Sequence, residues 1–459
     1  MQKINIRNKN NGSFLPLLLV ISTIGILLIT VVSDFALSNL KMGNNYSRKT
    51  TSREIAEAGI NYYQWHLSHN NIDFRDGQTT PANPPYGPYT HQYKNIQGEV
   101  IGEYTLMINP PDANNSYATV TSVGKTTDDN IGITIEATIG IPSFSQYAWV
   151  VNDQLYFGED ATTNGKVHSN DGVRFDGTAN SLITSAKQTY QYGCTSHEDK
   201  PGVWTQDNLG RFNQGYQFPV PAVDFNQITA NLQAIKTASK TADGIYLAPS
   251  GAEGYELKLK SNPNQIDIYK VTNANQNMIR TTFIRTANYP QNGVVFVEDN
   301  LFISGTFNGK MTIAAALLPD PGSSRDRKNI TIVDDVLYYN NTYDGTILLG
   351  LISQNDITVA RFIPRDLTLD GALLAQNGGT GVTFSGTFNN HDLGTLITHG
   401  GIASDLAVCN GYGMARYNTR GDIEGFSTRI YNYDPNLYFN PPPMYPTTGS
   451  YTILSWKQK

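Results

Sequence analysis

The sequence predicts a mainly β protein with a long N-terminal α-helix, a small antiparallel sheet, and then an irregular parallel β-helix-like solenoid. Three observations predict this fold. The pattern of residues is helical from about residue 14 to residue 69, and no proline occurs from Leu17 to Thr80. Runs of alternating apolar and polar residues follow between residues 98 and 141. From about residue 145 onward, glycine, asparagine and aspartate separate many short strand-like runs.

The first element is an apolar run close to the start of the chain. Phe14 to Val32 is nineteen residues without a charged side chain, close to the ~20 residues that a helix needs to cross a bilayer core. Basic residues precede it, namely Lys3, Arg7 and Lys9. They predict a single-pass membrane protein with a cytoplasmic N-terminus and its bulk outside the membrane. The best signal-peptidase site, Ala36, has Asp34 at the −3 position and is therefore poor.

One proline and three hydroxyl residues within the apolar run are compatible with a membrane helix. Pro16 lies in the first turn, where its missing N–H costs little. The hydroxyl groups of Ser22, Thr23 and Thr30 can donate to carbonyl oxygens of their own helix.

The junction between Gly12 and Ser13 separates a short charged leader, residues 1–12, from the apolar run. It resembles the signal that prepilin peptidase cleaves in type IV pilins and type II secretion pseudopilins. The resemblance implies cleavage after Gly12 and a mature chain that begins at Ser13, with methylation of that residue. Major pilins carry a glutamate at the fifth mature position, which here is Leu17. The departure points to a minor or tip-located member, and a simple membrane anchor remains the alternative.

The helical pattern continues beyond the membrane span. Within residues 51–67, apolar residues recur every three or four positions and form one stripe: Ile55, Ala58, Gly59, Tyr62, Tyr63 and Leu67. Gly43-Asn44-Asn45 is where we expect the helix to bend or fray. The segment "AEAG" resembles the region after the membrane helix in PilX-type minor pilins. Residues 13–94 are therefore expected to contain this helix and a proline-rich linker at 79–93, which can be neither helix nor interior strand.

A small antiparallel sheet is expected within residues 95–144. Its strands are predicted at 98–109, 116–125 and 131–141, with Pro110-Pro111 and the run 128–130 as turns. A long helix followed by such a sheet is the plan of a pilin head, which the resemblance implies.

The solenoid is predicted from a recurring aspartate that stands just before a strand, at positions 153, 171, 299, 335, 356 and 366. Most separations between successive aspartates suit solenoid coils of roughly 18–21 residues, or multiples of that length. Alternate residues of 293–313 share one face: Val295, Val297, Leu301, Ile303, Phe307, Met311 and Ile313. We interpret the aspartates as turn residues that bond their own backbone. A β-sandwich is the alternative to the solenoid.

Short segments of this region resemble pilus assembly proteins with a DUF4900-like domain, among them "NGKVHSNDGVRF" at 164–175 and the tail at 431–456. We divide it into a first solenoid part (145–221), a helical and hairpin insertion (222–290), a second solenoid part (291–430) and an extended Pro/Tyr-rich tail over the surface (431–459). Within the insertion, residues 222–242 read as a helix that Asp224 can cap, with Ile228, Leu232, Ile235 and Ala238 on one side.

The sequence contains few candidates for catalytic or metal-binding residues. It contains no nucleophile elbow, phosphate loop, HExxH motif or EF-hand loop, so we expect no enzyme, no cofactor and no metal site. His66 and His69 lie one helical turn apart but read as a solvated helix end. His168 reads as a packed turn residue, with a surface contact as the alternative. Cys194 and Cys409 form either one disulfide or two free thiols.

These observations favour a non-enzymatic minor pilin or pseudopilin, a rare or tip subunit of a type IV pilus-like extracellular filament. The net charge of −6 argues against nucleic-acid binding through a basic patch. The expected partners are other pilin subunits through the N-terminal helix, prepilin peptidase, the inner-membrane pilus assembly machinery, and a surface or glycan target. The alternative is a single-pass surface solenoid that binds or cleaves polysaccharide, and a third class is an envelope scaffold unrelated to pili.

Overall fold

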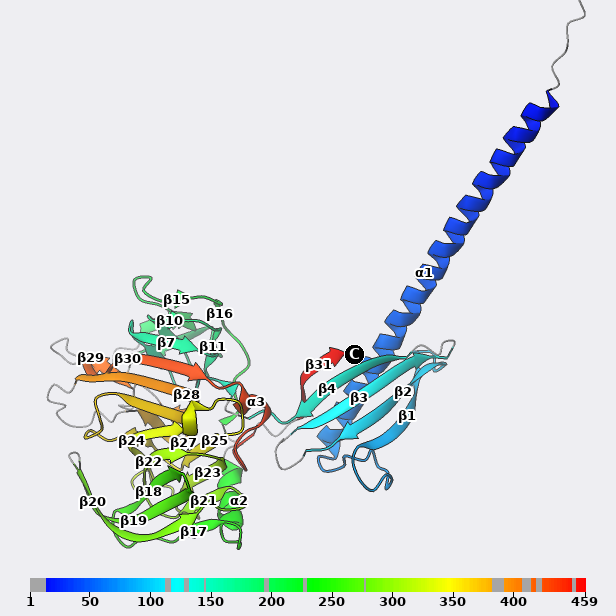
Figure 1. Cartoon of the computed structure of the whole chain (residues 1–459). Helices are drawn as coiled ribbons and strands as arrows, with labels where there is room; N and C mark the ends of the chain where they lie inside the picture. The colour runs from blue at the N-terminus through cyan, green and yellow to red at the C-terminus, as the bar shows by residue number, and fades with distance from the viewer. Residues whose placement is uncertain are drawn as a thin grey trace, which may run out of the picture. The chain divides into compact units, whose positions relative to one another are not determined.

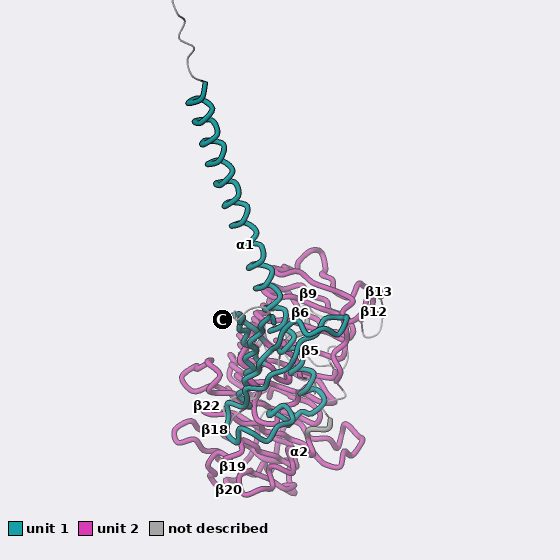
Figure 2. The backbone as a smooth tube through the Cα atoms, turned by 90° about the vertical axis from the view of Figure 1, so that its right-hand side faces the viewer, with its two compact units in different colours: residues 1–110, 119–138, 455–459 teal, residues 111–118, 139–454 magenta. Residues whose placement is uncertain are grey.

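The computed structural model describes residues 14–111, 117–127, 132–143, 146–193, 198–225, 229–275, 278–381, 392–406, 414–417, 423–447 and 451–459. The chain divides into two compact units (Figure 2). Residues 1–110, 119–138 and 455–459 form the helix unit, and residues 111–118 and 139–454 form the solenoid unit. The predicted fold class, a mainly β protein with one long N-terminal helix, is confirmed.

Helix α1 spans Leu15–His69 without interruption (Figure 1). The predicted bend at Gly43-Asn44-Asn45 is therefore wrong, because the helix continues through all three residues. Nothing lies within 4 Å of the position that a Gly43 Cβ would occupy. No neighbouring side chain therefore presses on the helix at this glycine.

A five-stranded sheet belongs to the helix unit, in the order β1-β2-β3-β4-β31. Its strands are β1 (Tyr86–Lys94), β2 (Val100–Asn109), β3 (Ala118–Thr126), β4 (Ile133–Gly140) and β31 (Thr452–Gln458). Strands β2, β3 and β4 match the three predicted runs to within two residues. The two outer strands, β1 and β31, were not predicted.

The proline-rich segment 79–93 is a linker only in its first half. Its second half forms strand β1, which pairs in the antiparallel sense with β2. Pro88 lies within β1, and the register of the pair shifts between Tyr86 and Tyr89. Proline is tolerated there because β1 is an edge strand, and the residue without an N–H falls at an irregularity.

The solenoid unit begins with short strands: β5 (Trp149–Val151), β6 (Leu155–Phe157), β7 (Ala161–Asn164), β8 (Val167–Ser169), β9 (Val173–Phe175), β10 (Thr178–Ala179), β11 (Ile183–Ser185), β12 (Thr189–Tyr192), β13 (Glu198–Pro201), β14 (Val203–Trp204), β15 (Arg211–Phe212) and β16 (Tyr216–Gln217). Helix α2 (Thr229–Ser239) follows, and then come β17 (Ile245–Leu247), β18 (Gly254–Ser261), β19 (Asn264–Asn275) and β20 (Met278–Asn288).

Longer strands complete the stack: β21 (Val294–Val297), β22 (Leu301–Phe307), β23 (Lys310–Ala315), β24 (Ile330–Tyr338), β25 (Leu348–Ser353), β26 (Ile357–Val359), β27 (Leu367–Gly381), β28 (Asp392–Leu406), β29 (Ala415–Tyr417) and β30 (Ile423–Tyr433). A 3-10 turn, Tyr339–Asn341, follows β24, and the short helix α3 (Asn436–Phe439) follows β30.

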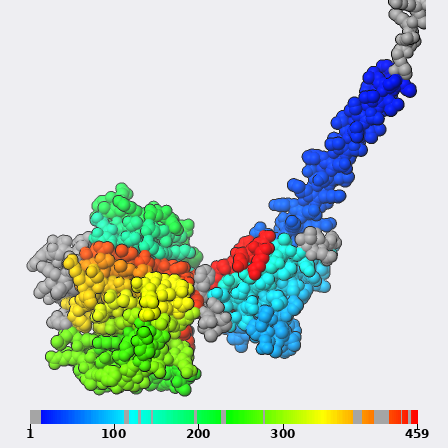
Figure 3. Space-filling model, viewed as in Figure 1, coloured from blue at the N-terminus to red at the C-terminus, as the bar shows by residue number. Residues whose placement is uncertain are grey.

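The coils stack through parallel pairing, as predicted, but the chain enters the stack in its middle. The first strands build outward through β7 and β8, β10 and β11, and finally β15 and β16. The chain then starts again at the opposite end with β17 and β18 and returns through β21–β28 (Figure 1). Strand β28 pairs with both β5 and β30, and β30 pairs with β7. The last coil therefore lies beside the first, and Figure 3 shows the orange band of late residues between the yellow and the blue-green coils.

Two details of the predicted solenoid differ from the structure. The segment 222–290 is not simply an insertion, because β17 and β18 pair in parallel with β21 and β22 and form a coil of the stack. The coils are also less regular than predicted. Hydrogen-bonded asparagines and aspartates on adjacent coils are separated by 16, 18, 27, 29 and 33 residues. Loops of different length leave the parallel register intact because they extend from the turns of the stack.

Apolar side chains fill the inside of the stack and also part of its outside. All seven residues predicted to share one face of 293–313 lie in the central core. The intervening residues Val294, Phe296 and Ala314 face outward against helix α2 and the segment after β30. Leu232 and Ile235 of α2 pack there as predicted, beside Leu437 and Tyr445, whereas Ile228 lies outside the described residues. This face of the solenoid is therefore buried on both sides.

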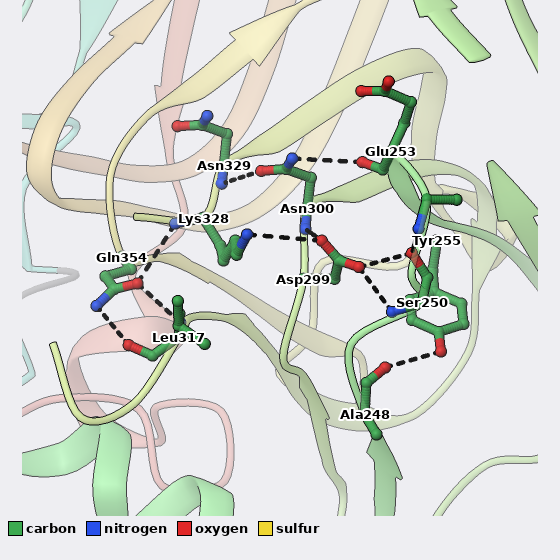
Figure 4. Close-up of polar contacts among 11 residues, drawn as sticks. Ala248, Ser250, Glu253, Tyr255, Asp299, Asn300, Leu317, Lys328, Asn329 and Gln354 are labelled. Atoms are coloured by element: carbon green, nitrogen blue, oxygen red, sulfur yellow. Dashed lines mark hydrogen bonds and ion pairs between the residues drawn. The ribbon is translucent and has the colours of Figure 1, made fainter. Parts of the chain in front are cut away.

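The recurring aspartates mostly bond to the neighbouring coil and not to their own backbone. Asp335 accepts from Thr368 N at 2.7 Å, and Asp366 accepts from Thr395 N at 2.6 Å. Figure 4 shows the same principle at Asp299, whose carboxylate accepts from Ser250 N at 2.8 Å. Two carboxylates also bond their own backbone as predicted: Asp153 accepts from Gln154 N at 2.7 Å, and Asp299 accepts from Asn300 N at 2.9 Å. The carboxylates of Asp299, Asp335 and Asp366 fasten one coil to the next.

Candidate membrane and assembly helix

The first half of α1 is apolar and exposed around its circumference. Phe14 is 70% exposed and Val32 is 65% exposed, and the large apolar residues between them are exposed to a similar degree. By length and composition this helix can cross a membrane, and none of the apolar window is buried within the protein. A helix that is apolar on all sides requires an apolar environment outside its own chain.

The hydroxyl groups in this helix make the predicted internal bonds. Ser22 donates to Leu19 O at 3.0 Å, Thr23 to Val20 O at 2.8 Å, and Thr30 to Leu27 O at 2.8 Å. Each hydroxyl is satisfied by its own helix and does not require a water molecule. Pro16 lies in the first turn, as expected.

Leu17, the residue at the fifth position after Gly12, is 53% exposed on the first turns of α1. It presents an apolar side chain where a major pilin would present a carboxylate. Gly12 and Ser13 lie outside the described residues, as does the leader 1–12, and so do Cys194 and Cys409. The predicted processing site and the alternative states of the cysteines therefore remain predictions.

The second half of α1 packs on the five-stranded sheet. The buried residues fall on one stripe: Ser52, Ile55, Ala56, Gly59, Ile60, Tyr63 and Leu67. Two glycines permit the close approach. A Cβ on Gly124 of β3 would come within 2.3 Å of Ser52 O, and a Cβ on Gly59 would come within 2.4 Å of Ser122 Oγ. The helix backbone therefore lies directly against the sheet at these positions.

A polar cluster holds the segment after α1 against the helix and the sheet. Tyr62 donates to Asp76 Oδ1 at 2.9 Å, and His91 Nε2 lies 2.6 Å from Asp76 Oδ2. Burial, and then the hydrogen bond to Asp76, raise the pKa of Tyr62 well above its ordinary value. Burial raises the pKa of the adjacent Tyr104 to about 12. At neutral pH both tyrosines are therefore protonated: Tyr62 donates to Asp76, and the Tyr104 ring packs against Tyr62 and His91.

Of the two histidines at the end of α1, which were predicted to be solvated, His66 differs from the prediction and His69 is exposed. His66 Nε2 lies 3.2 Å from Asp73 Oδ2, and the His66 side chain is only 14% exposed. Asp73 follows His69 by four residues, so the partner could have been recognised in the sequence if a turn had been expected there. His69 is exposed, with Nδ1 2.8 Å from Trp65 O. Within the described part of the chain, no group of three or more His, Cys, Asp or Glu residues could hold a metal ion.

His168 is packed within the solenoid, on strand β8. Its ring nitrogens lie 3.0 Å from Thr184 Oγ1 and 3.0 Å from Asn170 Oδ1. Burial lowers the pKa of the His168 imidazole. The side chain is thus a structural link between coils.

The end of the chain returns to the helix unit, which the sequence did not predict. The segment 434–447 covers the outer face of the solenoid, but β31 then joins the five-stranded sheet beside β4. Lys457 pairs with Glu136 of β4 at 3.0 Å, and Lys459 also hydrogen-bonds to Glu136. The guanidinium of Arg53 on α1 lies 5.3 Å from the ring centroid of Trp456. Residues from the last strand therefore contact both the sheet and the helix.

No family model and no curated protein matches the chain. One similar solved structure is the crystal structure of the competence-associated pilin ComZ from Thermus thermophilus. The two chains are 14% identical, with a TM-score of 0.29, and the alignment covers 90% of this chain and 98% of that chain. At this TM-score the likeness carries no argument about the function of this chain.

Proposed function

We propose that this protein is a pilin-type subunit, anchored in a membrane by α1 before it assembles into a filament. The observation that carries the proposal is that the two halves of α1 have different surroundings. One continuous helix of 55 residues is exposed and apolar in its first half and packs on an antiparallel sheet in its second half. The first half can rest in a lipid bilayer and then exchange lipid for the equivalent helices of neighbouring subunits.

Within this proposal, prepilin peptidase removes residues 1–12 and leaves Ser13 as the N-terminus. The exposed Leu17 then cannot form the ion pair that a glutamate at this position would make with a neighbouring N-terminus. A rare subunit, or one at the filament tip, does not require that pair. The size of the solenoid unit, residues 139–454, supports the same position, because so large a head is hard to repeat along a closely packed shaft.

The proposed role is structural and not enzymatic. The conspicuous polar groups of the solenoid, such as Asp299, Asp335 and Asp366, bond to other coils. In the proposed filament the solenoid is the part available for assembly contacts or for contact with surfaces.

Immunogold labelling of sheared filaments tests the proposed position. The proposal predicts label at filament ends, or at rare sites along the shaft. Regular labelling along the shaft would contradict the tip or rare-subunit role. Absence from filaments, together with an intact leader, would favour the alternative of a single-pass surface solenoid that binds or cleaves polysaccharide.

A further inference from the structure

A polar groove lies on one corner of the solenoid, where turns from successive coils meet. It consists of two cavities of about 430 and 540 Å³ that share Asn152, Asn170, Ala222 and Asp405. Each cavity is in the size range that accommodates a small molecule. Because two cavities lie along the stack, the groove can accept an elongated ligand.

The groove is held rigid by contacts among its own walls. Asn152 Nδ2 donates to Asp405 Oδ1 at 2.9 Å, and Asn170 Nδ2 donates to Asn152 Oδ1 at 2.8 Å. Asn170 also holds the segment before α2, since its Oδ1 accepts from Val223 N at 2.8 Å. The walls are therefore formed before any ligand enters, which reduces the entropy cost of binding.

The groove is rich in hydrogen-bond acceptors and negatively charged. Among the described residues that line it, the carboxylates are Asp153, Asp171, Asp224 and Asp405, and the one lysine or arginine is Lys187. Burial, followed by the proximity of Asp153, raises the pKa of the Asp171 carboxyl. A ligand that brings positive charge and several donors would offset this crowding of like charges.

A second observation points to a missing donor. Gln376 lines the groove, is only 7% exposed, and has an Oε1 atom without a hydrogen-bond partner. A buried carbonyl oxygen of this kind costs free energy unless a donor satisfies it. The side chain is thus placed to accept a hydrogen bond from a bound molecule.

A bare metal ion does not suit this site, because no set of three or more His, Cys, Asp or Glu residues in the described chain has a metal-holding arrangement. Phe225 contributes an apolar ring to one wall, which suits the C–H face of a sugar ring better than a hydrated ion. We propose that this polar groove binds a short stretch of glycan that contains amino sugars. The ammonium and hydroxyl groups donate to the carboxylates and to Gln376. This inference does not depend on filament assembly.

Calorimetric titration of the full-length protein, in phosphatidylcholine nanodiscs without sugar-based detergent, tests the inference. The probe is a glucosamine trimer, with maltotriose, spermidine and CaCl2 as comparisons. We expect the glucosamine trimer to bind at least about tenfold more tightly than maltotriose, because maltotriose lacks the ammonium groups. Equal binding of the two trisaccharides would overturn the amino-sugar assignment. Binding of spermidine or calcium without binding of the glucosamine trimer would overturn the saccharide assignment.

Two variants separate binding from folding. Asp171→Asn should weaken binding of the trimer about tenfold, since it removes one charge from the groove. Gln376→Leu should weaken binding several-fold while the melting temperature stays equal or rises, because it removes an unsatisfied buried group. The control, Glu159→Gln, removes a charge from an exposed turn that does not line either cavity and should bind as the wild type does. Unchanged binding in both groove variants would contradict the proposed site.

Discussion

Asn152, just after the first strand of the solenoid, donates a hydrogen bond to Asp405, which lies 253 residues later near the end of β28. This contact joins the start of the stack to one of its late strands, because β28 pairs with β5. The entering segment also meets the departing one, since Ser143 and Thr447 form an antiparallel bridge. A solenoid that ran from one end to the other would carry its two connections far apart. Here both connections lie together, which allows the final strand β31 to join the same sheet as β1–β4.

The close contact between α1 and β3 predicts that Gly124→Val destabilises the helix unit. The new Cβ would lie 2.3 Å from Ser52 O and 2.4 Å from Ala56 N, which are backbone atoms and cannot move aside cheaply. We expect a loss of about 1–3 kcal/mol in the free energy of unfolding. Thermal unfolding followed by circular dichroism measures it.

Gly43→Ala is the matched control, because nothing lies within 4 Å of its Cβ and the residue is helical. It should leave the melting temperature unchanged or raise it slightly. If Gly124→Val unfolded at the wild-type temperature, the described helix–sheet contact would be wrong.

The ion pairs between the last strand and Glu136 predict that the stability of the helix unit depends on pH. Hydrogen bonds from Lys459 and then Lys457 lower the pKa of Glu136 below its ordinary value of 4.5. The resulting stabilisation is fully present above pH 4.5 and is lost as the pH falls through the lower folded-state pKa. Its size is below about 1 kcal/mol, because both lysines are largely exposed.

Glu136→Gln should therefore lower the melting temperature slightly at pH 7 and have no effect once the wild-type carboxyl is protonated. Glu103→Gln, at an exposed position of β2, is the control and should leave the melting temperature unchanged both at pH 7 and at low pH. A Glu136→Gln effect of the same size at every pH would show that the ion pairs are not its cause.

Coil-to-coil bonds predict that Asp335→Ala weakens the solenoid. Its carboxylate accepts from Thr368 N on the next coil, so the truncation should cost about 1 kcal/mol. Asp334→Ala removes a carboxylate that bonds only within its own turn, to Asp335 N at 2.8 Å, and should cost less. Denaturant unfolding of the two variants compares them, and a larger loss for Asp334→Ala would contradict the proposed role of these bonds.

The exposed apolar half of α1 predicts that a charge in it reduces membrane retention. Ile26, which is 61% exposed, lies in the predicted span. Ile26→Arg should make insertion less favourable by about 2.5–3.5 kcal/mol if the position is central in the bilayer. Carbonate extraction of cell membranes followed by immunoblotting measures retention. Ile26→Leu is the control, and equal retention of the two variants would argue against a membrane span here.

Much of the fold could be predicted because local periodicity determines it. The 3.6-residue pattern predicted α1 and α2, and the two-residue pattern predicted β2, β3, β4 and the inward-facing residues of 293–313. The bend at residues 43–45 was wrong because an intrinsic preference against helix is small beside the propagation of a long helix on both sides.

The parts that could not be predicted depend on contacts between distant residues. Strand β1 contains a proline, Pro88, and only its place at the edge of a sheet makes it a strand. Strand β31 pairs with a sheet that begins hundreds of residues earlier in the chain. The chain enters the solenoid in the middle of the stack because β5 pairs with the late strand β28. No pattern within a short window encodes such pairings. The polar groove was also missed, because its carboxylates come from four separate places in the chain.

The most direct test of the central claim is the mature N-terminus of the protein, determined by mass spectrometry from both the membrane and the sheared-filament fraction. If α1 is an assembly helix as well as an anchor, the chain in filaments begins at Ser13, carries N-methylation, and lacks residues 1–12. A chain that still begins at Met1 in every fraction would contradict pilin-type processing and leave α1 as a membrane anchor alone.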